Sequence, residues 1–348
     1  MNVTIGSLCA GIGGLELGVE SALGATTAWQ AEIDPHASKV LAEHWPGVVN
    51  IGDIRDLTAM TPVDILTAGY PCQPFSTAGR RKGTDDPRHL WPAVHAAIAH
   101  LGPSLVVLEN VRGHLSLGFD RVLGDLADIG YDAEWRVVRA SDVGCCHQRA
   151  RLFVAAYPQG TERRATQPDA APAAVVRPAE PRERRGPDAA DAAHIGRERD
   201  GRTRDRGAGP TNSRFGPYAG AVERHEAWHG PAPDPTTDGR LNPRFVEWMM
   251  SYPTGWVEAA GSRNNQLRCL GNAVVPQVVA AFCAGLAGEE RPAPDDVPLL
   301  PTPTASYGDG GKHAKNLQWQ GDTAYRPSGA KASVSLMEAL DRTQDGAA

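Results

Sequence analysis

The sequence lacks the cysteine pattern of a metal site or of a disulfide framework. It has six cysteines in 348 residues, and no two of them stand in a CxxC arrangement. Scattered cysteines argue against a structural zinc site and against disulfide stapling. We therefore expect no bound metal, and we expect the adjacent Cys145 and Cys146 to be an incidental buried pair.

A long apolar run and a signal-peptide layout at the N-terminus are also missing. A membrane-spanning helix needs roughly 20 consecutive apolar residues, and a signal peptide needs a charged, an apolar and a small-residue part in order. Hydrophobic residues make up 41% of the chain and charged residues 22%, which is typical of soluble globular proteins. We expect a cytoplasmic monomer that does not bind membranes.

The sequence also has no surplus of positive charge. The formal net charge is −6, so no global basic field indicates a nucleic-acid partner. Net charge is an average, however, and an enzyme that acts on DNA needs only a local basic cleft.

The most informative stretch is residues 69–76, Gly-Tyr-Pro-Cys-Gln-Pro-Phe-Ser. The apolar run at residues 63–68 predicts a buried strand before it, and the two prolines predict a rigid, bent loop around Cys72. Ligands bind at the carboxyl ends of strands in open α/β sheets. A lone cysteine is more often a packing residue, but this position favours a nucleophile.

The N-terminal part has the layout of a nucleotide-binding unit. Residues 3–8 predict a strand, residues 9–14 (Cys-Ala-Gly-Ile-Gly-Gly) a tight turn, and residues 15–23 a helix. Neither GxGxxG nor a phosphate-binding P-loop is present. Glu32 and Asp53 close the next two predicted strands, and an acid at such a position binds ribose hydroxyls. Together these features favour an adenosine-type ligand.

Two further strands carry charged residues at their ends. Residues 103–108 predict a buried strand that ends at Glu109, where a carboxylate is costly without a partner or a task; capping the next helix is the alternative. Arg149 and Arg151 lead into a strand at residues 152–156. Alternate residues point to the same face, so the two arginines suit an anion or a polarised oxygen.

In this order and spacing, these stretches resemble the DNA cytosine-5 methyltransferases of phages and bacteria. The resemblance covers residues 3–157 and 241–287. Its motifs are residues 9–14, Gly69-Tyr70-Pro71-Cys72-Gln73, Glu109-Asn110-Val111, Arg149 with Arg151, residues 241–253, and the closing stretch 270–276 (Leu-Gly-Asn-Ala-Val-Val-Pro).

The resemblance implies an α/β fold: a Rossmann-like methyltransferase sheet with a small, largely irregular target-recognition lobe. It places the catalytic, cofactor-binding domain at residues 1–157 and the variable recognition region at 158–240. A closing segment at 241–287 returns to the catalytic domain. Residues 288–348 form a C-terminal extension of unknown role, which we expect to be an irregular and mostly disordered tail.

The resemblance also implies the chemistry. The Cys72 thiolate adds to carbon-6 of a cytosine that has swung out of duplex DNA. Protonated Glu109 binds ring nitrogen-3, and Arg151, paired with Arg149, contacts the carbonyl oxygen or places the thiol. S-adenosylmethionine donates the methyl group.

The implied binding residues form two sets. The cofactor set is Cys9, Ala10, Gly11, Gly13, Gly14, Glu32, Asp53, Ile54, Asn272 and Val274. The DNA set is Gln73, Ser76, Arg80 and Arg81. Two positions depart from the family pattern: Cys9 stands where phenylalanine is usual, which weakens aromatic packing against adenine, and His147 stands where glutamine is common.

The leading interpretation is thus a DNA cytosine-5 methyltransferase, with a restriction-modification or phage role open. A tRNA cytosine-5 methyltransferase and a catalytically inactive DNA-binding relative remain alternatives. A nicotinamide-dependent dehydrogenase shares the strand, glycine turn and helix, but it does not account for Pro71-Cys72-Gln73 or for residues 271–276.

Overall fold

We describe a computed structural model of the chain. The structure describes residues 2–71, 90–161, 213–286 and 299–304, together with the short pieces 318–320, 323–325, 336 and 339–340. The predictions for Cys72, Gln73, Ser76, Arg80 and Arg81 lie outside the described residues, as does most of the variable region.

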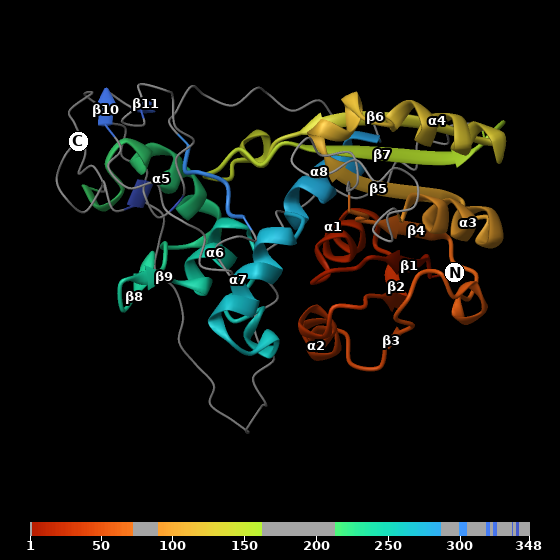
Figure 1. Ribbon diagram of the computed structural model, residues 1–348, viewed down its shortest axis with the longest axis horizontal. Coiled ribbons are helices and arrows are strands. Elements are labelled where there is room, and N and C mark those ends of the chain that lie inside the picture. Colours follow the sequence, from red (N-terminus) through yellow and green to blue (C-terminus); the bar gives the residue numbers. More distant parts are fainter. Residues whose placement is uncertain are drawn as a thin grey trace, which may run out of the picture.

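A seven-stranded sheet in the order β3-β2-β1-β4-β5-β7-β6 forms the centre of the molecule (Figure 1). Its strands are β1 (Thr4–Leu8), β2 (Thr26–Ala31), β3 (Val49–Asn50), β4 (Ile65–Ala68), β5 (Leu105–Val111), β6 (Tyr131–Val138) and β7 (Arg151–Pro158). The strands from β3 to β5 in this order run parallel, and β7 is antiparallel to both β5 and β6. The predicted α/β, Rossmann-like sheet is confirmed.

Helices cover both faces of the sheet. The α-helices are α1 (Gly14–Leu23), α2 (Pro35–His44), α3 (Trp91–Leu101), α4 (Phe119–Asp128), α5 (Ala219–His229), α6 (Pro243–Met249), α7 (Arg263–Asn272) and α8 (Pro276–Leu286). The 3-10 turns are η1 (Leu57–Ala59), η3 (Arg112–Ser116), η4 (Ala140–Val143), η5 (Ser213–Tyr218) and η6 (Glu258–Ala260). Two short hairpins pair β8 (Thr236–Thr237) with β9 (Arg240–Leu241), and β10 (Gln318–Gln320) with β11 (Thr323–Tyr325).

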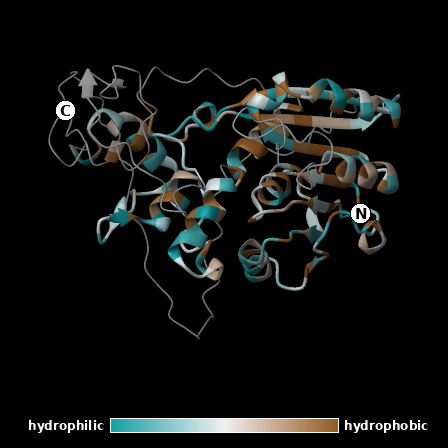
Figure 2. Ribbon diagram, viewed as in Figure 1, coloured by the Kyte–Doolittle hydropathy of each residue, from teal (hydrophilic) through white to brown (hydrophobic). Residues whose placement is uncertain are grey.

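Alternation along the strands divides the core into two clusters. On β5, Val107 faces the cluster that contains α1 and α8, while Val106 and Leu108 face the cluster that contains α3 and α4. Successive side chains of a strand point to opposite faces. The central strands therefore carry apolar residues on both faces, and they colour brown in Figure 2.

Helix α1 packs closely against α8. A Cβ added at Gly18 would lie 2.3 Å from the Cβ of Val279, so only glycine fits at this crossing. Because α8 follows the closing motif, this contact joins the chain after that motif to the first helix of the fold.

One helical stretch, Arg263–Leu286, is long and apolar enough to cross a membrane by length and composition, and 61% of the qualifying window is buried. The sequence analysis did not identify it. The stretch consists of two helices, α7 and α8, separated by extended backbone at Ala273 (φ −67°, ψ 159°). We assign it to the core.

Helices α5, α6 and α7 form a lobe beside the sheet, on the left of Figure 1. Helix α5 lies within the predicted variable region and packs against α6. Its His225 Nε2 is 2.7 Å from the carbonyl oxygen of Trp248 on α6, and Phe215 stacks on Phe245. These contacts join η5, α5 and α6 into one packed unit.

The predicted disordered tail is wrong for residues 299–304. Leu300 is 1% exposed and belongs to the core cluster around α1 and α8. Its N–H donates to the carbonyl of Cys146 at 2.8 Å. An apolar side chain buried in this way is removed from water, which accounts for the order of the segment.

Candidate functional site

A cavity of about 750 Å³ opens at the carboxyl ends of β1, β2, β4 and β5. Of the sequence-predicted cofactor residues, Cys9, Gly11, Glu32, Asp53, Ile54 and Asn272 line it; Ala10, Gly13, Gly14 and Val274 do not. Glu109 and Arg151 line the same cavity. The structure therefore brings these six candidate cofactor residues and the candidate catalytic residues Glu109 and Arg151 to one space.

The glycine turn and Glu32 form one wall. Gly11 has a left-handed backbone (φ +60°), and no atom lies within 4 Å of a Cβ built on it. Its N–H donates to Glu32 Oε2 at 2.8 Å, while Glu32 Oε1 accepts from the N–H of Asp34 at 2.7 Å. Burial raises the pKa of Glu32. A carboxylate fixed by two backbone donors keeps lone pairs free for a ligand hydroxyl.

Cys9 lies beside this wall with a left-handed backbone (φ +52°). Burial and then the nearby carboxylates of Glu32 and Asp53 raise the pKa of its thiol to about 12. The thiol is therefore neutral at physiological pH, which makes it a packing surface and not a nucleophile. Asp53 itself is half exposed and forms an ion pair with Arg55 at 3.1 Å.

Aromatic residues from distant parts of the sequence pack against the glycine turn. A Cβ at Gly13 would lie 2.2 Å from the Trp45 ring, and one at Gly14 would lie 2.4 Å from the Tyr252 hydroxyl. Trp256 Nε1 donates to the Ile12 carbonyl at 3.0 Å. Sequence analysis did not assign Trp45 or Trp256 to the site. The adjacent Gly13 and Gly14 were the sequence signal for these contacts, because glycine lets another group approach the backbone closely.

The Tyr252 hydroxyl donates to the Val274 carbonyl at 2.7 Å, and both groups lie against Gly14. Val274 thus supports the turn through its backbone and does not face the cavity. Two residues that sequence analysis missed close the opposite rim: Arg268 on α7 pairs with Asp34 at 3.2 Å, and both line the cavity.

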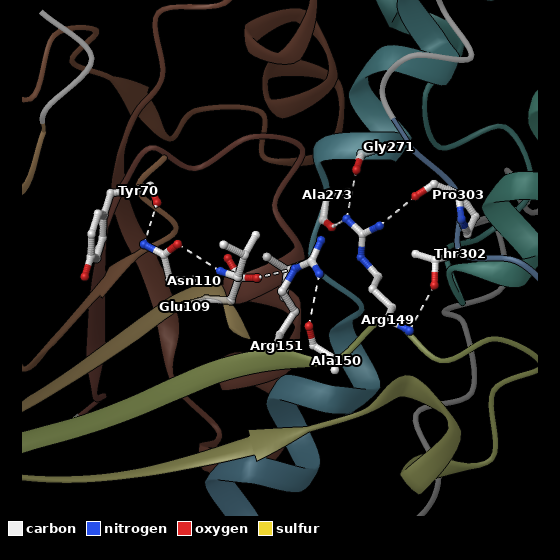
Figure 3. Close-up of polar contacts among 12 residues, drawn as sticks. Tyr70, Glu109, Asn110, Arg149, Ala150, Arg151, Gly271, Ala273, Thr302 and Pro303 are labelled. Atoms are coloured by element: carbon white, nitrogen blue, oxygen red, sulfur yellow. Dashed lines mark hydrogen bonds and ion pairs between the residues drawn. The ribbon is translucent and has the colours of Figure 1, made fainter. Parts of the chain in front are cut away.

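Glu109 and Arg151 form an ion pair at the far side of the cavity (Figure 3). Arg151 Nε lies 2.9 Å from Glu109 Oε1. In the antiparallel pair, Glu109 stands opposite Phe153 and Arg151 opposite Val111, so the two charged residues are diagonal neighbours on one face. Glu109 is 8% exposed. Burial raises its pKa, and the charges of Arg151 and Arg149 act in the opposite direction.

Asn110 fixes the chain that leads to the nucleophile motif. Its Nδ2 donates to the Tyr70 carbonyl at 3.0 Å, and its Oδ1 accepts from the N–H of Val111 at 2.8 Å. The Tyr70 hydroxyl lies 3.1 Å from His114 Nε2. A Cβ at Gly69 would be 3.9 Å from Glu109 Oε2. The segment that leads to the nucleophile motif therefore lies on the cavity wall, with Gly69 near Glu109.

Arg149, expected beside Arg151 at the reacting group, does not line the cavity. It is 4% exposed, and its guanidinium donates to the carbonyls of Gly271 and Pro303, each at 2.9 Å, and to that of Ala273. These contacts direct it to backbone oxygens. Among the described residues, no group of three or more His, Cys, Asp or Glu side chains could hold a metal ion.

Two solved structures share this fold. A DNA modification methyltransferase encoded within an E. coli prophage superposes with a TM-score of 0.51 at 19% identity, covering 82% of this chain and 98% of that one. The S. pombe Dnmt2 methyltransferase gives a TM-score of 0.51 at 15% identity, with the same coverages of 82% and 98%. At these identities the likeness shows the fold alone, a Rossmann-like α/β sheet covered by helices.

The sequence comparisons narrow the class. Residues 3–175 match the family of C-5 cytosine-specific DNA methylases. The type II methyltransferase M.HgiBI of Herpetosiphon aurantiacus is 37% identical over 160 residues, 44% of this chain and 36% of that protein. M.NaeI of Lentzea aerocolonigenes is 39% identical over 160 residues, 43% of this chain and 38% of that protein. Residues 3–175 thus carry a C-5 cytosine-specific DNA methylase domain. The match spans well under half the length of these two relatives.

Proposed function

We propose that the protein is a DNA cytosine-5 methyltransferase that acts on a flipped cytosine in duplex DNA through a covalent adduct with Cys72. The observation that carries this proposal is the cavity. One space holds the glycine turn with Glu32 and, across from them, the buried Glu109–Arg151 pair. A methyl donor and an acceptor ring need such a shared space.

The first wall fits S-adenosylmethionine. The open face of Gly11 allows close approach of a ligand to the backbone, and Glu32 offers carboxylate oxygens to ribose hydroxyls. Ile54, 4% exposed, and the neutral Cys9 thiol offer apolar contact to a purine. When bound, S-adenosylmethionine supplies an electrophilic methyl group.

The second wall fits a pyrimidine. In the proposed reaction, the Cys72 thiolate forms a bond to carbon-6, and the displaced ring electrons make carbon-5 nucleophilic while nitrogen-3 takes a proton from Glu109. Carbon-5 would then take the methyl group as the bond from that carbon to the sulfonium sulfur breaks, which leaves S-adenosylhomocysteine. Loss of the carbon-5 proton to solvent restores the double bond and expels Cys72 as thiolate, and nitrogen-3 returns its proton to Glu109. Covalent catalysis of this kind divides one difficult step into easier ones.

Glu109 must be protonated to donate. Burial favours the neutral acid, and Arg151 favours the carboxylate. A pyrimidine carbonyl that accepts a hydrogen bond from Arg151 competes with the ion pair and moves Glu109 towards the neutral acid. The 2.9 Å pair is thus the resting state of a donor that substrate binding activates.

The target base must leave the duplex, at a cost of a few kcal/mol, before it can enter the cavity. Gln73, Ser76, Arg80 and Arg81 stay predicted DNA contacts. The domain boundaries, the cytoplasmic location and the monomeric state also stay predictions. Relatives named type II methyltransferases favour a modification role beside a restriction enzyme, and a phage origin stays a prediction.

Bisulfite sequencing of DNA from cells that express the protein tests the proposal. We expect protected cytosines within one short sequence context, and none in cells that express Cys72→Ser. A purified-protein assay with duplex DNA and with tRNA separates the leading function from the RNA alternative. Methylation of tRNA alone, or equal methylation by Cys72→Ser, would contradict the proposal.

A further inference from the structure

Residues 299–304, which we call the C-terminal strap, lie outside the family match at residues 3–175. They nevertheless pack directly beside the arginine motif. Leu300 forms a parallel bridge with His147, and its N–H donates to Cys146 at 2.8 Å. With its side chain 1% exposed, Leu300 anchors the strap in the core.

The strap then contacts Arg149 twice. The Arg149 N–H donates to Thr302 Oγ1 at 3.0 Å, and its Nη1 donates to the Pro303 carbonyl at 2.9 Å (Figure 3). Its Nη2 donates to the carbonyls of Gly271, near the end of α7, and of Ala273, which follows α7. Arg149 therefore joins three segments that are distant in sequence: the chain just before β7, the end of α7 and the strap.

Arg149 needs this support for two reasons. Its backbone is left-handed (φ +32°), a conformation that a non-glycine residue keeps only where its surroundings fix it. Its charge is also buried, so each carbonyl acceptor offsets part of the desolvation cost. The strap supplies the acceptor for the strained N–H and one of the acceptors for the side chain.

Arg149 binds residues that form part of the wall of the catalytic cavity. Arg151, two residues on, pairs with Glu109, while Gly271 and Ala273 line the cavity opposite. A change in the backbone at Arg149 would displace Arg151, which lies two positions further on and is the first residue of β7. The charge of Arg149 also opposes the effect of burial on Glu109.

We propose that the C-terminal strap is a positioning element of the methyl-transfer site, in which Thr302 and Pro303 hold Arg149 so that Arg151 and Glu109 keep their places. The inference rests on the proposed function. The strap touches no reacting atom in this account, so Thr302 is a positioning residue and not a catalytic one.

Thr302→Val tests the proposal, because valine keeps the shape and removes the acceptor. We expect single-turnover methyl transfer to fall about three- to tenfold, in line with one lost neutral hydrogen bond, with the dissociation constant for S-adenosylmethionine within about twofold of wild type. The pH at which the rate falls should rise, since a displaced Arg149 no longer holds down the pKa of Glu109.

Two more variants frame this result. Thr161→Val is the matched control: it removes a threonine hydroxyl that donates to the backbone carbonyl of Pro158, at the far end of β7, and it should behave as wild type. Arg149→Lys keeps the charge but replaces the planar fork with one ammonium, which cannot serve the three carbonyls in the same geometry. Its rate should fall further than that of Thr302→Val.

The proposal is overturned if Thr302→Val matches Thr161→Val in rate and pH profile. It is equally overturned if the rate falls only in step with cofactor affinity and melting temperature while the pH profile stays fixed, because that pattern reports general loosening. A wild-type protein that transfers no methyl group would refute the proposed function, and the role of the strap with it; the wild-type arm thus separates the two failures.

Discussion

At the scale of single residues, the account depends on side chains that share a cavity but differ in state. Glu109 is buried against an arginine, whereas Glu32 is held by two backbone N–H groups. Burial raises the pKa of both carboxyls. The surroundings therefore suit Glu109 to donate a proton and Glu32 to accept a hydrogen bond from a hydroxyl group.

Glu109→Gln should lower the single-turnover rate of methyl transfer by a factor of about 100 or more, because a general acid typically contributes ~10²–10⁴-fold. Affinity for S-adenosylmethionine should stay within about threefold, since the cofactor wall is untouched. Rapid-quench kinetics measure the rate, and exposed Glu43→Gln is the control. A Glu109→Gln rate within tenfold of wild type would argue against the proton-donor role.

The Glu109 assignment also predicts a pH dependence. The acid must be protonated, so the single-turnover rate should fall as the pH rises through the pKa of Glu109, which burial raises above its ordinary value near 4.5. Glu109→Gln should abolish that limb. A falling limb that persists unchanged in Glu109→Gln would assign it to another group.

At the scale of elements, the glycine turn depends on what packs behind it. Trp256→Phe removes the donor to the Ile12 carbonyl while keeping an aromatic ring. We expect affinity for S-adenosylmethionine to fall about three- to tenfold, the range of one lost hydrogen bond, with little change in the rate at saturating cofactor. Isothermal titration calorimetry measures the affinity. Unchanged affinity would show that the turn keeps its shape without this support.

Substitutions at two glycines should change stability in opposite directions. Gly18→Ala places a Cβ 2.3 Å from Val279 and should lower the free energy of unfolding by about 1–3 kcal/mol. Gly124→Ala, within α4 where nothing lies within 4 Å, should raise it by about 0.5–1 kcal/mol. Urea denaturation measures both. The same sign for both variants would contradict the packing of α1 on α8.

At the scale of the whole molecule, buried histidines make stability depend on pH. His147 and His225 each place Nε2 against a backbone carbonyl, and desolvation lowers the pKa of each to about 3. In the unfolded chain their pKa is near 6.5. Between these values the unfolded state binds more protons, so stability falls as the pH drops from about 6.5 towards 3.

Inside that window, each histidine should lower the free energy of unfolding by about 1.4 kcal/mol for each pH unit of acidification, because the unfolded chain takes up a proton that the folded chain does not. Denaturation series at pH 7.5, 6 and 5 should show it, and His225→Gln should reduce it. Exposed His100→Gln is the control. Equal slopes for wild type and His225→Gln would show that His225 is not buried neutral.

Much of this architecture could be predicted because it is local in the sequence. Apolar runs marked the strands, and strand ends marked Glu32 and Glu109. The support of Arg149 could not be predicted, since Thr302 and Pro303 lie more than 150 positions further along the chain and only folding brings them together. For the same reason Trp256, 244 residues from Ile12, was missed.

The central claim is that a sulfur–carbon bond to cytosine forms at Cys72. A duplex that carries 5-fluorocytosine in the methylated context tests it most directly, because fluorine at carbon-5 blocks the proton loss that releases the enzyme. With S-adenosylmethionine present, the account predicts a denaturation-stable adduct that peptide mapping assigns to Cys72 and that Cys72→Ser does not form. No adduct from active wild-type protein, or an adduct at another cysteine, would contradict it.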